Sequence, residues 1–192
     1  MPESTLIVIS SPSGGGKDVI IARLMKIFQN STKLVTTTTR EPRSGETPGL
    51  SYNFVSKETF EDKMKNNELL EHNKYNGNYY GVDKVVLAET LTKNSFVFTN
   101  IDVNGKASLD KNNIKHLAIF LLPESLDVLE RRIKARGGVV EEDIKERLKT
   151  AKKEIEMSGD YDYKVVNKDG HIEEAVAEIE SIIRGVDKKT GI

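Results

Sequence analysis

The feature that most constrains this chain is a short apolar run that leads into three consecutive glycines and a lysine. Residues 6–9 read Leu-Ile-Val-Ile, and such a run of β-branched side chains is typical of a strand buried on both faces. Glycines occupy 14–16, Lys17 follows, and apolar residues then recur at helical spacing over 19–28. Glycines let consecutive backbone N–H groups point inward, and the helix start and the lysine add positive charge. The segment therefore predicts a phosphate-binding loop between a strand and a helix.

The match to the common phosphate-loop pattern, G-x-x-x-x-G-K followed by Ser or Thr, is incomplete. Gly16 and Lys17 fit, but Ser11 occupies the position of the first glycine and Asp18 that of the Ser or Thr. The alternative is a glycine-rich turn that only links a strand to a helix, and the strand-loop-helix context makes it the weaker interpretation. The candidate phosphate-binding residues are Ser11, Pro12, Ser13, Gly14, Gly15, Gly16, Lys17 and Asp18.

Composition narrows the class of protein and its partners. A chain of 192 residues suits one domain with a small insert. Its formal net charge of -1 creates no field that would attract nucleic acid or a membrane, and we expect neither as a partner. The chain has no cysteine, and its three histidines are scattered, so no metal site of these residues is predicted. No signal peptide fits before the first strand and no apolar run is long enough to span a bilayer, so we expect a cytoplasmic protein.

The order of the predicted elements indicates the fold class. Strands alternate with helices along most of the chain, which predicts an α/β fold with a mostly parallel sheet covered on both faces. A β-rich block over 33–82 interrupts this alternation and predicts an inserted lobe. The strands expected within the block lie at 34–40, at 52–55 and in an aromatic hairpin at 69–82. A last amphipathic helix is expected over 172–183, with a frayed tail from Gly185.

A second set of spaced motifs makes the chain resemble a known family. Residues 38–46 read Thr-Thr-Arg-Glu-Pro-Arg-Ser-Gly-Glu, and 52–55 read Tyr-Asn-Phe-Val. Glu71 then precedes Gly-Asn-Tyr-Tyr-Gly at 77–81. Together these motifs resemble the GMP-binding lobe of guanylate kinases, and the resemblance extends over about residues 5–184.

This resemblance implies the architecture. It implies a P-loop three-layer fold with a mostly parallel sheet, an inserted β-rich nucleoside-monophosphate-binding lobe and a helical lid. The chain would be a single domain over 1–192. Its parts would be a core of 1–32, 83–135 and 158–192, a GMP-binding lobe of 33–82 and a lid region of 136–157.

The resemblance also implies roles for single residues. ATP would bind, with Mg²⁺, at the loop of 11–18, and Asn167 would lie near the adenine. The residues holding the GMP phosphate would be Arg40, Arg43, Tyr52 and Tyr80. The residues reading guanine would be Thr36 and Glu71, with Asp102 at a strand end close to the acceptor nucleotide. The catalytic cations would be Lys17, Arg136 and Arg147, with Arg132 in the neighbourhood of the lid.

The chemistry of these residue types supports the implied roles. Guanidinium groups bind phosphate through paired hydrogen bonds, so Arg40 and Arg43 beside a tyrosine can form an anion clamp. The carboxylate of Glu71 can accept from both N1–H and N2–H of guanine, whereas N1 of adenine is itself an acceptor. A buried carboxylate there can discriminate between the two bases by about 10⁴. Each residue taken alone would more often be a surface charge or a packing residue, and their joint spacing reverses that preference.

Four positions depart from the family pattern. Ser11 replaces a glycine, and Val82 stands where Ser or Thr is usual, which removes one hydrogen bond to the base. Asp18 replaces the hydroxyl that normally meets Mg²⁺, and Asn100 stands where an acid is usual. Two interpretations of Asp18 are open: an acid favoured by the dipole of a helix start, or a group that assists Mg²⁺ directly or through water. We expect the second.

The sequence thus predicts a phosphotransferase that moves the terminal phosphoryl group of Mg-ATP to GMP, giving GDP and ADP. One alternative is an enzyme similar to the kinases that phosphorylate ribose 1,5-bisphosphate, whose loop also resembles Gly-Lys-Asp at 16–18. Another is a non-catalytic guanylate-kinase-like module that binds phosphorylated partners, against which Lys17 and the glycines argue. The sequence leaves open whether the protein is a monomer or a homodimer.

Overall fold

The computed structural model describes residues 4–75, 77–135 and 140–189. Within these ranges, five parallel strands form a central sheet in the order β2-β7-β1-β8-β9. Their bounds are β1 (Thr5–Ser10), β2 (Ser31–Lys33), β7 (Phe96–Thr99), β8 (Leu117–Pro123) and β9 (Tyr163–Asn167). This arrangement confirms the mostly parallel sheet predicted from the sequence.

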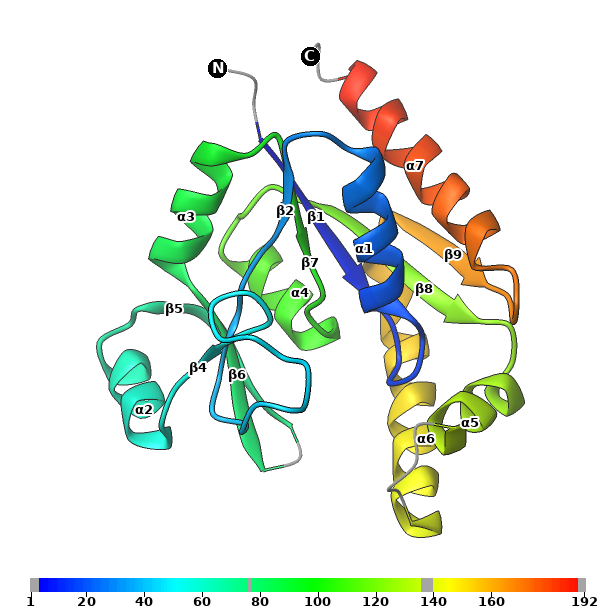
Figure 1. Cartoon of the computed structure of the whole chain (residues 1–192), viewed down its shortest axis with the longest axis horizontal. Helices are drawn as coiled ribbons and strands as arrows, with labels where there is room; N and C mark the ends of the chain where they lie inside the picture. Colours follow the sequence, from blue (N-terminus) through cyan, green and yellow to red (C-terminus); the bar gives the residue numbers. More distant parts are fainter. Residues whose placement is uncertain (1–3, 76, 136–139, 190–192) are drawn as a thin grey trace.

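Helices pack around both the central sheet and the inserted lobe. In the described part of the chain they are α1 (Lys17–Ile27), α2 (Lys57–Lys65), α3 (Lys84–Lys93), α4 (Val103–Lys111), α5 (Leu126–Ala135), α6 (Glu141–Glu156) and α7 (Ile172–Lys189). The helices α1 and α7 lie on one face and α3 and α4 on the other (Figure 1). The result is the three-layer α/β architecture predicted above.

The two faces of β1 explain why its sequence is apolar throughout. Ile7 and Ile9 join the apolar cluster formed with α1 and α7. Leu6 and Val8 join a different cluster, formed with α3 and α4. All four side chains are at most 2% exposed. Because successive side chains of a strand alternate between faces, a strand buried on both faces needs an uninterrupted apolar run.

A second, mixed sheet forms the inserted lobe. Among the described residues its strand order is β4-β3-β6-β5, with β3 (Thr37–Thr38), β4 (Asn53–Phe54), β5 (Leu69–Tyr75) and β6 (Asn78–Asp83). The Ser56 hydroxyl caps α2 by accepting from the Thr59 N–H at 3.1 Å. The fully buried Phe60 ring then stacks on the Tyr79 ring at 5.3 Å between centroids, which attaches α2 to this sheet.

The structure divides the single strand predicted at 34–40. The Leu34 N–H still donates to the Phe98 carbonyl of the central sheet at 2.7 Å. Two residues later the Thr36 carbonyl accepts from β4, so the chain has passed into the lobe. β-branched residues suit either sheet, and the sequence pattern therefore does not show where the chain leaves one for the other.

The last helix is longer than the predicted 172–183. It continues to Lys189, beyond the tail expected to fray from Gly185. Ile182 and Val186 pack against the α1 and α7 cluster. The apolar stripe at helical spacing thus extends past the predicted end, which explains why the helix continues beyond residue 183.

Gly81 in β6 leaves no room for a side chain. A Cβ there would lie 2.9 Å from the Glu71 carbonyl oxygen and 3.0 Å from the Phe60 ring. We expect Gly81→Ala to lower the free energy of unfolding by about 1–3 kcal/mol, because the backbone must shift to admit the methyl group. Urea denaturation measures this loss. Gly159→Ala is the control, since a Cβ there meets no atom within 4 Å, and an equal loss in both variants would contradict the explanation.

Candidate active site

A cavity of about 240 Å³ lies at the carboxyl ends of the central strands, between the phosphate loop, the lobe and α6. Its lining residues are Ser11, Ser13, Gly14, Gly15, Gly16, Lys17, Asp18, Thr36, Tyr52, Glu71, Asn73, Tyr80, Gly81, Asn100, Ile101, Asp102, Arg147, Thr150 and Glu154. Most of the residues that the sequence singled out therefore surround one space. Four described candidates are not part of its wall, namely Pro12, Arg40, Arg43 and Asn167. Arg136 lies outside the described residues.

The phosphate loop is wound tightly around Lys17. Gly14 and Gly16 have φ angles of 91° and 92°, a backbone conformation that L side chains rarely adopt. The Lys17 ammonium donates to the Ser11 carbonyl at 2.9 Å and to the Ser11 hydroxyl at 3.2 Å. Ser11, a departure from the common glycine, thus gives the lysine an additional acceptor. Because α1 begins at Lys17, the N–H groups of its first turn lie at the cavity.

Asn167, which the resemblance places near adenine, is hydrogen-bonded to the backbone of the phosphate loop. It is 3% exposed, and its Nδ2 donates to the Gly15 carbonyl at 2.9 Å. A Cβ on Gly16 would lie 2.8 Å from the same Nδ2, so the close contact also requires glycine there. Its Oδ1 is buried without a hydrogen-bond partner among the described residues. The end of β9 therefore positions the loop and presents one unused acceptor beside it.

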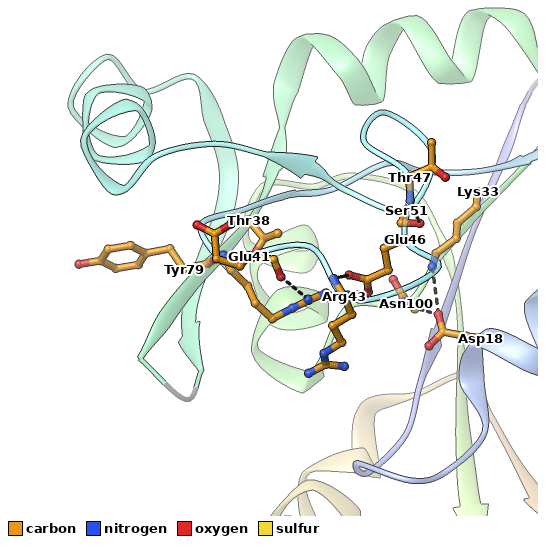
Figure 2. Close-up of polar contacts among 11 residues, drawn as sticks. Asp18, Lys33, Thr38, Glu41, Arg43, Glu46, Thr47, Ser51, Tyr79 and Asn100 are labelled. Atoms are coloured by element: carbon orange, nitrogen blue, oxygen red, sulfur yellow. Dashed lines mark hydrogen bonds and ion pairs between the residues drawn. The ribbon is translucent and has the colours of Figure 1, made fainter. Parts of the chain in front are cut away.

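Asp18 is held by two side chains that the sequence did not connect to it. Its Oδ1 accepts from Lys33 Nζ at 2.9 Å and from Asn100 Nδ2 at 2.8 Å, and both point at it in Figure 2. Partial desolvation raises the pKa of Asp18, but Lys33, Lys17 and Asn100 more than offset this and hold the pKa below its ordinary value. The carboxylate is therefore ionised at the cavity wall, with Oδ2 not used by these bonds.

Two carboxyl groups form the acidic end of the cavity. Glu71 on β5 is 8% exposed, and burial, followed by the charge of Asp102, raises the pKa of Glu71 to about 8. Asp102 caps α4: its Oδ1 accepts from the Gly105 N–H at 2.8 Å. Its Oδ2 accepts from Asn73 Nδ2 at 2.6 Å. In the described part of the chain, the Glu71 carboxyl group makes no hydrogen bond, so it remains available to a ligand.

The predicted phosphate clamp is tied to a third residue, Glu46. The Arg40 guanidinium donates to Glu46 Oε1 at 2.7 Å. The backbone N–H of Arg43 donates to Glu46 Oε2 at 2.8 Å (Figure 2). This pairing lowers the pKa of Glu46 and raises that of Arg40. The Arg40 guanidinium also lies 5.4 Å from the centroid of the Tyr52 ring. The Tyr52 and Tyr80 rings meet in a T-shaped arrangement with their centroids 6.1 Å apart. Both tyrosines line the cavity, whereas Arg40 does not line it but lies over the Tyr52 ring.

One face of α6 supplies the remaining wall. Arg147, Thr150 and Glu154 follow at helical spacing and all line the cavity. Burial raises the pKa of Glu154 to about 7, with Lys17 lowering it and Asp102 raising it further. The sequence motifs mark Arg147 but not Thr150 or Glu154, although their spacing from Arg147 on α6 is the signal that points to them. Arg132 instead bonds Asp169 Oδ1 and the Asn167 carbonyl at 3.2 Å each.

Val82, the position that lacks the usual hydroxyl, belongs to the core. It is 1% exposed and packs with Leu34 and Leu87 in the cluster on the α3 and α4 face. An apolar residue is well suited to that environment.

Two further properties concern the described ranges only. None of their helices has both the length and the apolar character needed to cross a membrane. Nor do they contain a cluster of three or more His, Asp or Glu side chains arranged to hold a metal ion.

A glycine loop and lysine at the carboxyl end of the first strand of a parallel sheet, opposite a second lobe, define the class of protein. The fold is that of P-loop kinases.

Comparison with known proteins identifies the family. The family model "Guanylate kinase" matches residues 3–186. The guanylate kinase of Clostridium tetani is 44% identical over 95% of this chain and 86% of its own. That of Rickettsia felis is 40% identical over 85% of each chain. The crystal structure of guanylate kinase from Anaplasma phagocytophilum is 31% identical, with a TM-score of 0.77 over 97% of this chain and 88% of its own. The chain belongs to the guanylate kinase family and is an enzyme, a kinase, which confirms the resemblance found in its sequence.

Glu71 should make stability depend on pH. Its folded-state pKa of about 8 lies above the ordinary value of 4.5, so the folded protein keeps a proton that the unfolded chain releases. The contribution of this proton to the free energy of unfolding is complete below about pH 4.5 and is lost as the pH rises through about 8. Glu71→Gln cannot lose this proton. We expect it to gain on the order of 5 kcal/mol of unfolding free energy relative to wild type between about pH 4.5 and pH 9.

Urea denaturation across this pH range measures the difference. Glu58→Gln, on the exposed face of α2, is the matched control and should follow wild type at every pH. A constant offset between wild type and Glu71→Gln over the whole range would show that Glu71 is already ionised in the folded protein.

Proposed function

We propose that this enzyme transfers the terminal phosphoryl group of ATP to GMP, giving ADP and GDP. The observation that carries the proposal is the single cavity that has the phosphate loop on one wall and Tyr52, Glu71 and Tyr80 of the lobe on the other. A donor phosphate on the loop and an acceptor phosphate at the tyrosines would then face one another. No protein nucleophile is required, because phosphoryl transfer depends on positioning and on neutralising charge.

On the donor side, the proposed ATP-binding residues are those of the loop from 11 to 18 together with Asn167. The loop offers backbone N–H groups and the Lys17 charge to phosphate oxygens. The free Oδ1 of Asn167 can accept from the amino group of adenine. Arg147 on α6 would add a further cation opposite Lys17, and we retain Arg136 as a proposed catalytic residue.

On the acceptor side, the proposed GMP-binding residues are Thr36, Arg40, Arg43, Tyr52, Glu71, Tyr80 and Asp102. Glu71 accounts for base selection. Guanine offers two N–H donors to one carboxylate, and their hydrogen bonds stabilise its ionised form in the buried site. Adenine would leave that carboxyl group facing an acceptor. For the phosphate, Tyr52 and Tyr80 line the cavity and Arg40 lies behind Tyr52.

We further propose that three parts of the single domain act as units. The segment 33–82 is the GMP-binding lobe, 136–157 is the lid, and 1–32, 83–135 and 158–192 form the core. The separate sheet of the lobe and the packing of α6 against α5 support this division. Movement of the lobe and lid toward the core would exclude water and so limit wasteful hydrolysis of ATP.

Mg²⁺ bound with ATP would neutralise charge on the phosphates. Asp18 is the described residue best placed to assist it, since a carboxylate is a hard oxygen ligand at the cavity wall beside Lys17. Its Oδ1 is occupied by Lys33 and Asn100, which orient the group and leave Oδ2 for the ion or an intervening water. Lys33 offsets the charge that would otherwise repel the nucleotide.

Two other functions account less well for the cavity. Transfer to ribose 1,5-bisphosphate is favoured by Asp18 in the loop, but this substrate has no base for Glu71 to recognise. A non-catalytic module that binds phosphorylated partners would not need the loop, whose glycines and lysine are all in place.

A coupled assay of ADP release across GMP, dGMP, AMP, UMP and ribose 1,5-bisphosphate tests the proposal. We expect GMP to be the preferred acceptor and AMP to be worse in kcat/KM by about 10⁴, because Glu71 has no donor to accept from in adenine. Turnover of AMP within tenfold of GMP would contradict the role of Glu71. Turnover of ribose 1,5-bisphosphate alone would select the rival kinase, and failure to bind ATP would select the binding module.

Asp18 is tested through the dependence of rate on free Mg²⁺ at saturating ATP and GMP. We expect Asp18→Ala to lower kcat at least about tenfold and to raise the Mg²⁺ concentration needed for half activity, because a hard oxygen ligand is lost. Asp18→Ser restores a hydroxyl and should keep much of the activity. Asp18→Asn separates the charge of the group from its shape. Superimposable Mg²⁺ curves for wild type and Asp18→Ala would leave Asp18 only as an acid at a helix start.

A further inference from the structure

Asn73 occupies a position in the cavity that the sequence motifs do not mark. It lies on β5 two residues after Glu71, and side chains two apart on a strand share a face. Both residues line the cavity. Asn73 Nδ2 donates to Asp102 Oδ2 at 2.6 Å, a short hydrogen bond between the lobe and the first residue before α4.

The orientation of the Asn73 amide follows from its second bond. Its Oδ1 accepts from the Lys74 backbone N–H at 2.8 Å. A backbone N–H can only donate, so the oxygen must lie on that side and the amino group must face Asp102. The Lys74 N–H needs an acceptor and the Asp102 carboxylate needs a donor, so the Asn73 amide can satisfy both only in this orientation.

Asp102 is thereby held at both oxygens. Its Oδ1 accepts from the Gly105 N–H at 2.8 Å, which fixes it to α4, while Oδ2 is fixed to β5 through Asn73. Gly105 also brings α4 close to Glu71, because a Cβ there would lie 3.4 Å from Glu71 Oε2. The separation of the two acidic side chains is thus set by one backbone contact and one side-chain bond.

We propose that Asn73 is a positioning residue of the acceptor-base subsite: it holds the Asp102 carboxylate beside Glu71 and so sets the affinity for the base of the acceptor nucleotide. The inference rests on the proposed function, in which the acidic end of the cavity receives guanine. Its amino group also offsets part of the charge that Asp102 presents to Glu71. Without it, Asp102 keeps its bond to α4 but loses its fixed distance from the base.

The alternative is that Asn73 only ties β5 to α4. The two roles differ in what they do to substrate kinetics. A tie that merely stabilises the protein would lower the melting temperature and affect ATP and GMP alike, whereas a positioning residue affects GMP selectively.

The first experiment compares KM for GMP and for ATP in wild type, Asn73→Ala and His72→Ala. His72 is the exposed neighbour on the opposite face of β5 and serves as the matched control. We expect Asn73→Ala to raise the KM for GMP about tenfold, with kcat and the KM for ATP within about twofold of wild type, and His72→Ala to match wild type. A KM for GMP within twofold of wild type, or equal increases for both substrates, would overturn the proposal.

The wild-type protein in the same assays separates this inference from the function on which it rests. If wild type does not phosphorylate GMP, the proposed function fails, and the assignment of Asn73 fails with it. If wild type phosphorylates GMP and Asn73→Ala is unimpaired, only the assignment of Asn73 fails.

Discussion

The close packing of the phosphate loop against the rest of the domain is the constraint on which the site depends. A Cβ on Gly14 would lie 3.2 Å from Leu129, and a Cβ on Gly16 would lie 2.8 Å from Asn167. The loop is therefore fixed to α5 and to β9 as well as to the β1 and α1 segments that it joins. Backbone N–H groups bind an anion well only when they are held in place beforehand, and these contacts supply that order before any ligand arrives.

The opposite end of the cavity contains buried carboxyl groups whose ionisation is unfavourable. Glu71, Asp102 and Glu154 all face a space that contains Lys17, and burial raises the pKa of both glutamates. Such groups lower stability above neutral pH, a cost that a purely structural core would not carry. In the proposed enzyme these carboxyl groups can contribute to binding, because a ligand with N–H donors would hydrogen-bond to the ionised carboxylates and so stabilise them.

The departures from the family pattern compensate for one another within the structure. Asn100 stands where an acid is usual, but it donates to Asp18 at 2.8 Å, so a carboxylate is still present at this point of the cavity. This carboxylate, that of Asp18, belongs to α1, whereas the acid usual at position 100 would follow β7. Lys33, from the neighbouring edge strand, balances its charge at 2.9 Å. One negative charge is therefore present at this point of the cavity, carried by Asp18 and not by residue 100.

The sequence by itself determined the β1–loop–α1 unit, because an apolar run, positive-φ glycines and a helical stripe are local properties of the chain. It also determined the family, through motifs that keep their spacing. Only the tertiary structure decided where the chain passes from one sheet to the other near Leu34, and which side chains meet across the cavity. Asn73 and Asp102 are 29 residues apart, and Asp18 and Asn100 are 82 apart. No periodicity connects such pairs, because their hydrogen bonds exist only after β5 has packed against α4 and β7 against β1.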